Sequence, residues 1–487
     1  MRRTFLLLLM LLGIPGFGLG VAYILGSHLG EMAFGRPLAG ASILAGAAGL
    51  ALLLLVWLAA ILCGDRRERL VVVFRILVRC VAVLVAGLVV TQGGIAVVGL
   101  ALLQDGLMHA VSLGLFVPMG LGVVYGAYEM VEAAFETVRP QDMTVVGIAV
   151  TEAMQPRLWQ RIRAVAAQLG ARPPDHVVLG LQPNFFATAA NVRPSGAKIR
   201  LSGETLYLSA PLMGVLSENE FAAVLGHEFS HFLKKDTAYS LRFLPVYQGL
   251  SQALAATDQD GKSHGLAFLP AQVVLGFTLS RFGRAERSIS RSREIEADRA
   301  GTEVAGASAI IGALVKIAAT DPAWDRVMAL SVQAINQGQD MENISRTLID
   351  ATWQLFNVIP HAALLATVAD RRQPHPTDSH PTLSTRAAAL DVPLDPALFA
   401  RDAEASRAID LIEDREATER SLTQLFTDDL IARGFARPAS GLQRRTAFQM
   451  KRDTLAKRAA ARKQTLAAAR PAEGEQVTDT ETPQTAP

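Results

Sequence analysis

The residues best suited to chemistry lie in one short stretch, residues 227–231, which has the pattern His-Glu-x-x-His. His227 and His231 are four positions apart and would share one face of an α-helix, so their imidazoles converge as two ligands of a tetrahedral Zn²⁺ must. Glu228 would project beside them, where its carboxylate can take a proton from water and pass it to a leaving amine. The stretch predicts a hydrolytic site with one Zn²⁺ per chain. The alternative is that the two histidines are merely structural.

A second stretch can supply the third zinc ligand. Glu294 and Asp298 lie four residues apart, and the small residues Ala297 and Gly301 lie on the same helical face, so this helix can approach the histidine helix closely. We predict that Glu294 binds the metal and that Asp298 accepts a hydrogen bond from a ligand imidazole. Glu296 points elsewhere and is predicted to be a surface charge. The alternative is that Glu294 and Asp298 only pair with neighbouring arginines on a solvated face.

The helix that carries the histidines has a well-defined start. Ser217 and Glu220 have the spacing of a capping box, in which each side chain satisfies a free backbone amide of the first turn. Phe221, Val224 and Leu225 then form an apolar stripe at helical spacing. We therefore expect the two histidines on a capped, partly buried helix.

Elements of mixed type precede this helix. The apolar spacing from residue 155 to 169 predicts an amphipathic helix that ends at Gly170. Short apolar runs predict strands at residues 176–181, 198–201 and 205–209, with the last two joined as a hairpin by a turn at 202–204. A small sheet should therefore lie next to the histidine helix.

In these motifs the sequence resembles metallopeptidase family forty-eight, the group of the HtpX heat-shock proteases, the zinc-dependent CAAX prenyl protease and the mitochondrial stress protease Oma. The resemblance covers roughly residues 150–390. Four ordered motifs carry it: Asn184-Phe185-Phe186-Ala187-Thr188, His227 to His231 with Asp236 five residues on, Glu294 to Asp298, and His380-Pro381 followed by Arg386.

The resemblance implies a gluzincin-type α+β domain, mainly helical, with one zinc and with Glu228 as the base in peptide-bond hydrolysis. It also places Asn184, Ala187 and Arg386 at the substrate cleft. Phe185 departs from the family pattern, which often has Ala there. A loop with two further histidines, His375 and His380, is rich in proline, which favours a structural loop over a second metal site.

The N-terminal part predicts a helical membrane anchor. Half of the chain is apolar, and residues 5–25, 38–63, 80–103 and 107–128 each have about the length that crosses a hydrocarbon core. The first stretch could instead be a cleaved signal peptide. An apolar stretch at 265–280 implies either two further crossings between residues 237 and 280 or none, because a single crossing would separate the zinc ligands. Arg242 and Pro245 in the earlier part favour none or a re-entrant hairpin.

The orientation of the anchor follows from its arginines. We expect a loop between the second and third stretches, and this loop should be cytoplasmic by the positive-inside rule because the other loops are poor in Lys and Arg. It carries Arg66, Arg67, Arg69, Arg75 and Arg79. Two crossings later, the soluble part returns to the same side. The predicted location is therefore a bacterial inner membrane, with a multi-pass anchor and a cytoplasmic catalytic domain.

These observations divide the chain into four parts. We expect a transmembrane anchor at 1–130, a zinc metallopeptidase domain at 140–395, a charged helical region at 396–470 and a disordered tail at 471–487. The basic end of the third part is either a lipid-binding helix or merely a solvated one. The net charge of +2, with both signs interspersed, argues against nucleic-acid binding.

The expected function is a membrane-bound zinc metalloendopeptidase whose partners are the lipid bilayer and protein or peptide substrates, membrane proteins among them. By resemblance, its role is quality control of membrane proteins. Processing of prenylated CAAX proteins is a competing activity, which goes with more membrane spans. A catalytically silent, zinc-stabilised scaffold or adaptor is the alternative from another class, and the intact Glu228 argues against it because a structural site needs no base.

Overall fold

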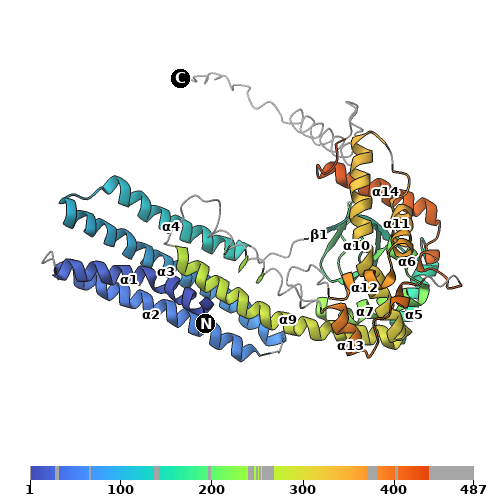
Figure 1. Ribbon diagram of the computed structural model, residues 1–487, viewed down its shortest axis with the longest axis horizontal. Helices are drawn as coiled ribbons and strands as arrows, with labels where there is room; N and C mark the ends of the chain where they lie inside the picture. The colour runs from blue at the N-terminus through green and yellow to red at the C-terminus, as the bar shows by residue number, and fades with distance from the viewer. Residues whose placement is uncertain are drawn as a thin grey trace, which may run out of the picture.

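Four long helices form a bundle at one end of the molecule, and a mainly helical domain with a small sheet lies at the other end (Figure 1). The computed structural model describes residues 2–27, 32–64, 67–136, 142–195, 199–237, 268–339, 341–370, 381–400 and 404–437, together with a few positions between 239 and 254. The expected loop with His375 and His380, the basic stretch before residue 470 and the tail at 471–487 lie outside these residues.

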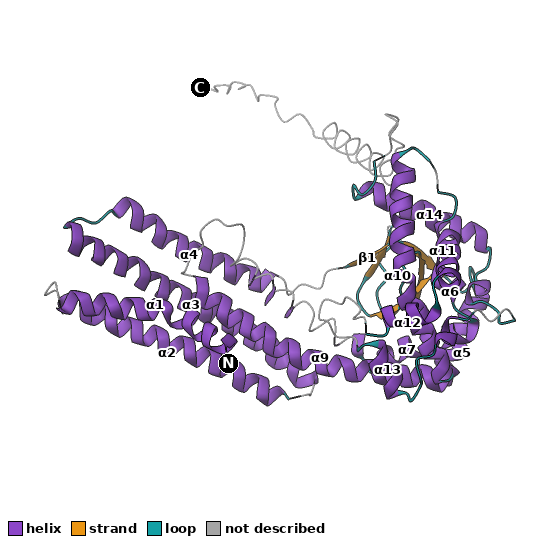
Figure 2. Cartoon of the chain, viewed as in Figure 1, coloured by secondary structure: helices purple, strands orange, loops and turns teal. Residues whose placement is uncertain are grey.

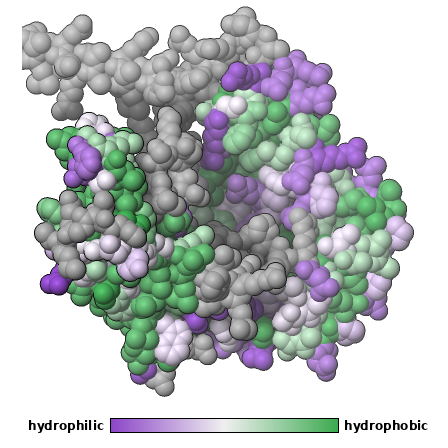
Figure 3. Space-filling model, turned by 60° about the vertical axis from the view of Figure 1, so that its left-hand side comes forward, coloured by the Kyte–Doolittle hydropathy of each residue, from purple (hydrophilic) through white to green (hydrophobic). Residues whose placement is uncertain are grey.

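The bundle helices correspond to the four predicted apolar stretches, but the expected loop before the third stretch is wrong, because from Arg67 onward it is the first part of a longer helix. They are α1 (Arg2–Ser27), α2 (Met32–Cys63), α3 (Arg67–Met108) and α4 (Leu113–Glu136). Among the described residues, each of the four is long and apolar enough to cross a membrane. Exposed apolar side chains such as Leu44 and Leu62 cover much of the bundle, and green surface is extensive on the left-hand side of Figure 3, where the bundle is turned forward. The structure is therefore that of a protein with several candidate transmembrane helices.

The first helix is an integral part of this bundle. Leu11 of α1 is buried, and its carbonyl oxygen accepts a hydrogen bond from Nε2 of Gln92 in α3 at 3.3 Å. Gly18 of α1 faces Ser42 of α2 and Ile95 of α3 so closely that a Cβ would clash with both. Such packing favours a retained first span over a cleaved signal peptide.

The sheet lies beside the histidine helix (Figure 2). Its four strands have the order β2-β3-β6-β4, with β3 and β6 parallel and the other pairs antiparallel. β1 and β5 form a separate parallel pair. The strands are β1 (Met143–Val145), β2 (Gly147–Val150), β3 (His176–Gly180), β4 (Phe186–Thr188), β5 (Val192–Pro194) and β6 (Thr205–Ser209).

Two of the predicted strands are present as β3 and β6, but the predicted hairpin is wrong. β6 pairs with β3 and β4, whereas Leu201 forms an isolated bridge with Val192. The physical reason is that every residue of β6 is buried. A fully buried strand needs a neighbour on each side, and the sequence-local hairpin would supply only one.

Helices surround the sheet and form one core with it. They are α5 (Pro156–Gln168), α6 (Ala210–Val215), α7 (Glu218–Leu233), α10 (Ala307–Asn336), α11 (Ile344–Val358), α12 (His361–Val368), α13 (Leu383–Ala389) and α14 (Arg415–Ala432), with short 3₁₀ turns η3 (Pro396–Phe399) and η4 (Ala408–Leu411). α5 is the predicted amphipathic helix, and Gly170 beyond it has φ of +63°. The same core includes Phe399, Leu422 and Leu430, so the predicted boundary at residue 395 does not coincide with a break in packing.

One helix, α9 (Leu269–Ala305), belongs to both parts of the molecule (Figure 1). Its first half packs against α2 and α3, where the rings of Phe74 and Phe282 stack with centroids 4.6 Å apart. Its second half packs along α7. The apolar residues up to 280 thus form the buried start of α9, while most of the stretch from 238 to 267 lies outside the described residues. α9 and α10 meet at an angle of 119°. Because α10 packs in the core of the peptidase part, α9 and α10 together are not a single transmembrane segment.

Candidate metal centre

The histidine helix α7 begins at the predicted capping box. The Ser217 hydroxyl accepts a hydrogen bond from the Glu220 backbone N–H at 3.2 Å, and the Glu220 carboxylate accepts one from the Ser217 backbone N–H at 2.9 Å. Lys316 of α10 donates to the other oxygen of Glu220 at 2.6 Å, and this pair is buried. The start of α7 is therefore fixed both by its own cap and by a neighbouring helix.

α7 and α9 approach closely because their contact is made of small residues. A Cβ on Gly301 would lie 2.6 Å from the Ala223 carbonyl oxygen, and a Cβ on Gly226 would lie 2.8 Å from a methyl group of Val304. Ala297 is fully buried at the same contact. The predicted close approach of the two helices is thus confirmed, and it brings their polar side chains within reach of one another.

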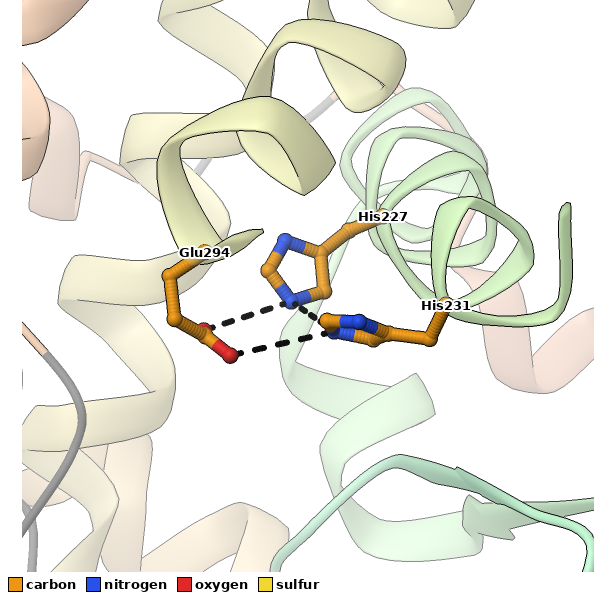
Figure 4. Close-up of side chains that lie close together, drawn as sticks. All are labelled: His227, His231 and Glu294. Carbon is orange, nitrogen blue, oxygen red and sulfur yellow. Dashed lines mark hydrogen bonds and ion pairs between the residues drawn. The ribbon is translucent and has the colours of Figure 1, made fainter. Parts of the chain in front are cut away.

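His227, His231 and Glu294 converge on one point (Figure 4). The two Nε2 atoms are 3.3 Å apart, and the Glu294 carboxylate oxygens lie 3.7 Å from Nε2 of His227 and 3.8 Å from Nε2 of His231. Ligand atoms bound to one tetrahedral zinc at about 2.0–2.2 Å lie roughly 3.3–3.6 Å from each other. The donor set of two imidazoles and one carboxylate also suits zinc. The three residues therefore fit a zinc ion with a fourth position left for water or substrate.

A buried carboxylate and arginine support His227. Nδ1 of His227 lies 2.9 Å from Oδ1 of Asp298, and Arg386 of α13 donates from Nε to Oδ2 of Asp298 at 2.7 Å and from Nη2 to Oδ1. Asp298 is fully buried and Arg386 is nearly so. Burial opposes the charge on Asp298, but the charge and hydrogen bonds of Arg386 outweigh it and lower the pKa to about 2. An ionised Asp298 holds the His227 Nδ1–H, which leaves Nε2 free for a metal.

A second relay of the same kind supports His231. Nδ1 of His231 lies 3.2 Å from Oδ2 of Asp236, whose other oxygen lies 3.0 Å from Nε of Arg293. Burial opposes the charge on Asp236, but its hydrogen bond with His231 and the charge of Arg293 lower its pKa. Each ligand imidazole is therefore oriented by an aspartate, and each aspartate is held by an arginine.

The remaining predicted residues occupy distinct places. Glu228 is buried on α7, and its charge acts on both His231 and Arg386. Glu296 is not part of the metal group and forms an ion pair with Lys234, as expected for a surface charge.

The residues predicted for the substrate cleft come from different elements. Arg386 lies behind Asp298 with a side chain only 4% exposed, so it differs from the prediction and acts as a positioning residue. It is buried because a metal-site aspartate with no exposed surface requires a cation at its side. Ala187 is on β4, the end strand of the described sheet, which packs against α7, and Asn184 is exposed just before it.

The roles of Arg293 and Arg386 were missed from the sequence. Arg293 directly precedes Glu294, and its position in the sequence suggests only a solvated partner of Glu294 or Asp298. In the structure it pairs with Asp236, which follows the end of α7. The sequence signal for Arg293 is Asp236, five residues after His231. An aspartate that is buried at this position needs a cation beside it.

The fold and this site define a metallopeptidase of the His-Glu-x-x-His class with a glutamate as third ligand. Residues 152–393 match the model of peptidase family M48. The chain belongs to this family as a zinc metallopeptidase, and His227, His231 and Glu294 are its metal site.

Comparison with curated proteins finds relatives named protease HtpX homolog. The one from Thermoplasma volcanium is 26% identical over 298 residues, covering 56% of this chain and 92% of that protein. The one from Archaeoglobus fulgidus is 32% identical over 167 residues, covering 33% of this chain and 46% of that protein. The one from Acidiphilium cryptum is 28% identical over 236 residues, covering 44% and 78% respectively. No solved structure matches the chain at a significant level.

Proposed function

We propose that this protein is a membrane-bound zinc metalloendopeptidase that hydrolyses protein substrates at the cytoplasmic membrane face, in quality control of membrane proteins. The observation that carries the proposal is the buried Glu228 beside a three-residue metal site, on a helix packed against one that continues into the membrane bundle. A site that serves only to stabilise a fold needs no such carboxylate. The position of the site beside the bundle favours substrates that present a segment near the bilayer.

Glu228 is the proposed general base. A zinc ion held by His227, His231 and Glu294 would supply a Lewis acid that polarises the scissile carbonyl and acidifies water. Glu228 takes a proton from the attacking water and delivers it to the nitrogen of the leaving amine. The aspartates behind the two imidazoles keep each Nδ1 protonated, which fixes the orientation of both rings during the reaction.

The end strand β4 is the proposed docking edge for substrate. β4 pairs with β6 on one side only among the described strands, and it lies against the helix that carries Glu228. A peptide in extended conformation can add to such an edge through its main chain, with little demand on its sequence. Ala187 on this strand and Asn184 before it would contact the peptide, which agrees with an endopeptidase of broad specificity.

The proposed cytoplasmic location of the catalytic domain rests on the orientation of the helical bundle in the membrane. The connection from α2 to α3, the end of α4 and the exit of α9 all lie at the end of the bundle that faces the peptidase domain (Figure 1). The arginines of α3 lie at this same end, including Arg69, Arg75 and Arg79. By the positive-inside rule this end is cytoplasmic, so the catalytic domain is cytoplasmic as well.

The decisive experiment compares membranes that contain the wild-type protein with membranes that contain Glu228→Gln. The variant should keep zinc near one per chain, while cleavage falls by at least about a hundredfold, and substrates should accumulate in the membrane proteome. His227→Ala should lose both zinc and activity, and the surface variant Glu296→Gln should lose neither. Wild-type cleavage rates in purified Glu228→Gln would reject this site as the catalytic one.

A further inference from the structure

The first half of α9 and the start of α3 gather positive charge at one level of the bundle. The stacked rings of Phe74 and Phe282 set the register of the two helices, so Arg75 and Arg281, each next to a stacked ring in the chain, lie at the same level. Residues 67–80 and 281–291 together carry eight arginines and two glutamates. We call Arg75, Arg79, Arg281, Arg284 and Arg287 the arginine collar.

The collar adjoins the exposed apolar surface of the bundle. Ile76, the neighbour of Arg75, is 60% exposed, and Val83, about two turns further along α3, is 52% exposed. Exposed apolar and basic side chains that adjoin on one helix are typical of the boundary between hydrocarbon and headgroups. On α9, the residues beyond Arg281 become charged and lead toward the metal site.

The charges of the collar are not neutralised within the described part of the protein. None of its five arginines forms an ion pair with a described acidic group. The Nε atoms of Arg79 and Arg281 are buried and have no hydrogen-bond acceptor, although their guanidinium groups lie over the rings of Phe135 and Phe277. A guanidinium group without a carboxylate partner is well matched by phosphate oxygens, which would bind its N–H groups other than the buried Nε.

We propose that the arginine collar binds the phosphate groups of anionic lipids and thereby fixes α9, the helix that carries Glu294. α9 is continuous from Leu269 to Ala305, so Glu294 lies only 13 residues, or about 20 Å of helix, after Arg281. Lipids that bridge α3 and α9 hold the base of this helix against the bundle. Zinc retention and cleavage should then depend on the anionic lipid content of the membrane, a consequence that rests on the proposed peptidase function.

The test uses the full-length protein in nanodiscs of phosphatidylcholine with an increasing fraction of phosphatidylglycerol. Anionic lipid retained by the protein is measured by native mass spectrometry, and bound zinc and peptide cleavage are measured on the same samples. The variant Arg281→Gln/Arg284→Gln should retain anionic lipid on the order of tenfold more weakly, and its cleavage should no longer respond to phosphatidylglycerol. Arg281→Lys/Arg284→Lys keeps both charges and should restore most of the response.

The matched control is Arg346→Gln/Arg420→Gln, which removes two exposed arginines from α11 and α14, on the peptidase side of the molecule. It should behave like the wild type. Unchanged lipid retention in the Arg281/Arg284 variant overturns the proposal, and so does full activation by glycerol phosphate in solution, which would indicate a site for soluble anions. Because lipid retention is read without catalysis, an inactive protein that still selects anionic lipid refutes the peptidase function and leaves the collar intact.

Discussion

Gly301→Ala should separate the two helices that share the zinc site. The added Cβ would lie 2.6 Å from the Ala223 carbonyl oxygen, whereas ordinary contact begins at 3.4 Å, so α9 and α7 must move apart by about 0.8 Å. Zinc sites tolerate ligand displacements of only about 0.2 Å. Alanine gains about 1 kcal/mol of helix propensity over glycine, but overpacking costs about 1–3 kcal/mol. We expect net destabilisation, weaker zinc binding and cleavage reduced by up to about a hundredfold.

The control for this prediction is Gly276→Ala on the same helix, where no atom lies within 4 Å of the added Cβ. It should be neutral or should stabilise the protein by up to about 1 kcal/mol. Thermal unfolding of the detergent-solubilised protein measures the stability, and a competing chelator measures the zinc affinity. If Gly301→Ala matches Gly276→Ala in both measurements, the α7–α9 contact is looser than the structure shows and does not set the ligand geometry.

Three further predictions follow from the site and the bundle. Glu294→Ala should remove most bound zinc and Glu296→Ala should not, as metal analysis of the purified proteins would show; the reverse result would assign the wrong carboxylate. Asp298→Asn should weaken zinc binding about 10- to 100-fold and cost about 3–5 kcal/mol of stability, because it leaves Arg386 buried without its anion; unchanged chelator competition would contradict this. A reporter fused after Glu136 should behave as cytoplasmic, and a periplasmic signal there would overturn the four-span topology.

The ligands could be predicted from the sequence because their geometry is local to single helices. The spacing of His227 and His231 determines that they share a face once the segment is helical, and the capping box at Ser217 makes the helix definite. Glu294 and Asp298 obey the same rule on α9, and the small residue Gly301 indicated how near the two helices could come. Each of these inferences needs only helical periodicity and residue size.

The supporting arginines could not be predicted in the same way because their partners lie on other elements. Arg386 reaches Asp298 from a separate short helix 88 residues further along the chain. Arg293 is next to a ligand in sequence, yet helical geometry turns it toward the end of α7 and Asp236. The false hairpin has the same origin, since turn residues at 202–204 describe a local bend and do not say which strands flank β6. Which strands pair, and which arginine meets which aspartate, depends on the burial of these residues in the folded protein. A single sequence does not reveal that burial.

The predicted division of the chain into an anchor and a catalytic domain does not describe how the two parts pack. α9 follows the catalytic histidines in the chain, yet Val274, Leu275 and Phe282 on it are buried in the same cluster as Leu70 and Phe74 of the bundle. Removing the bundle would expose this apolar face on the helix that supplies Glu294, and an exposed face of that kind favours aggregation. The membrane part therefore does more than hold the enzyme at the bilayer, because it completes the support of a metal ligand.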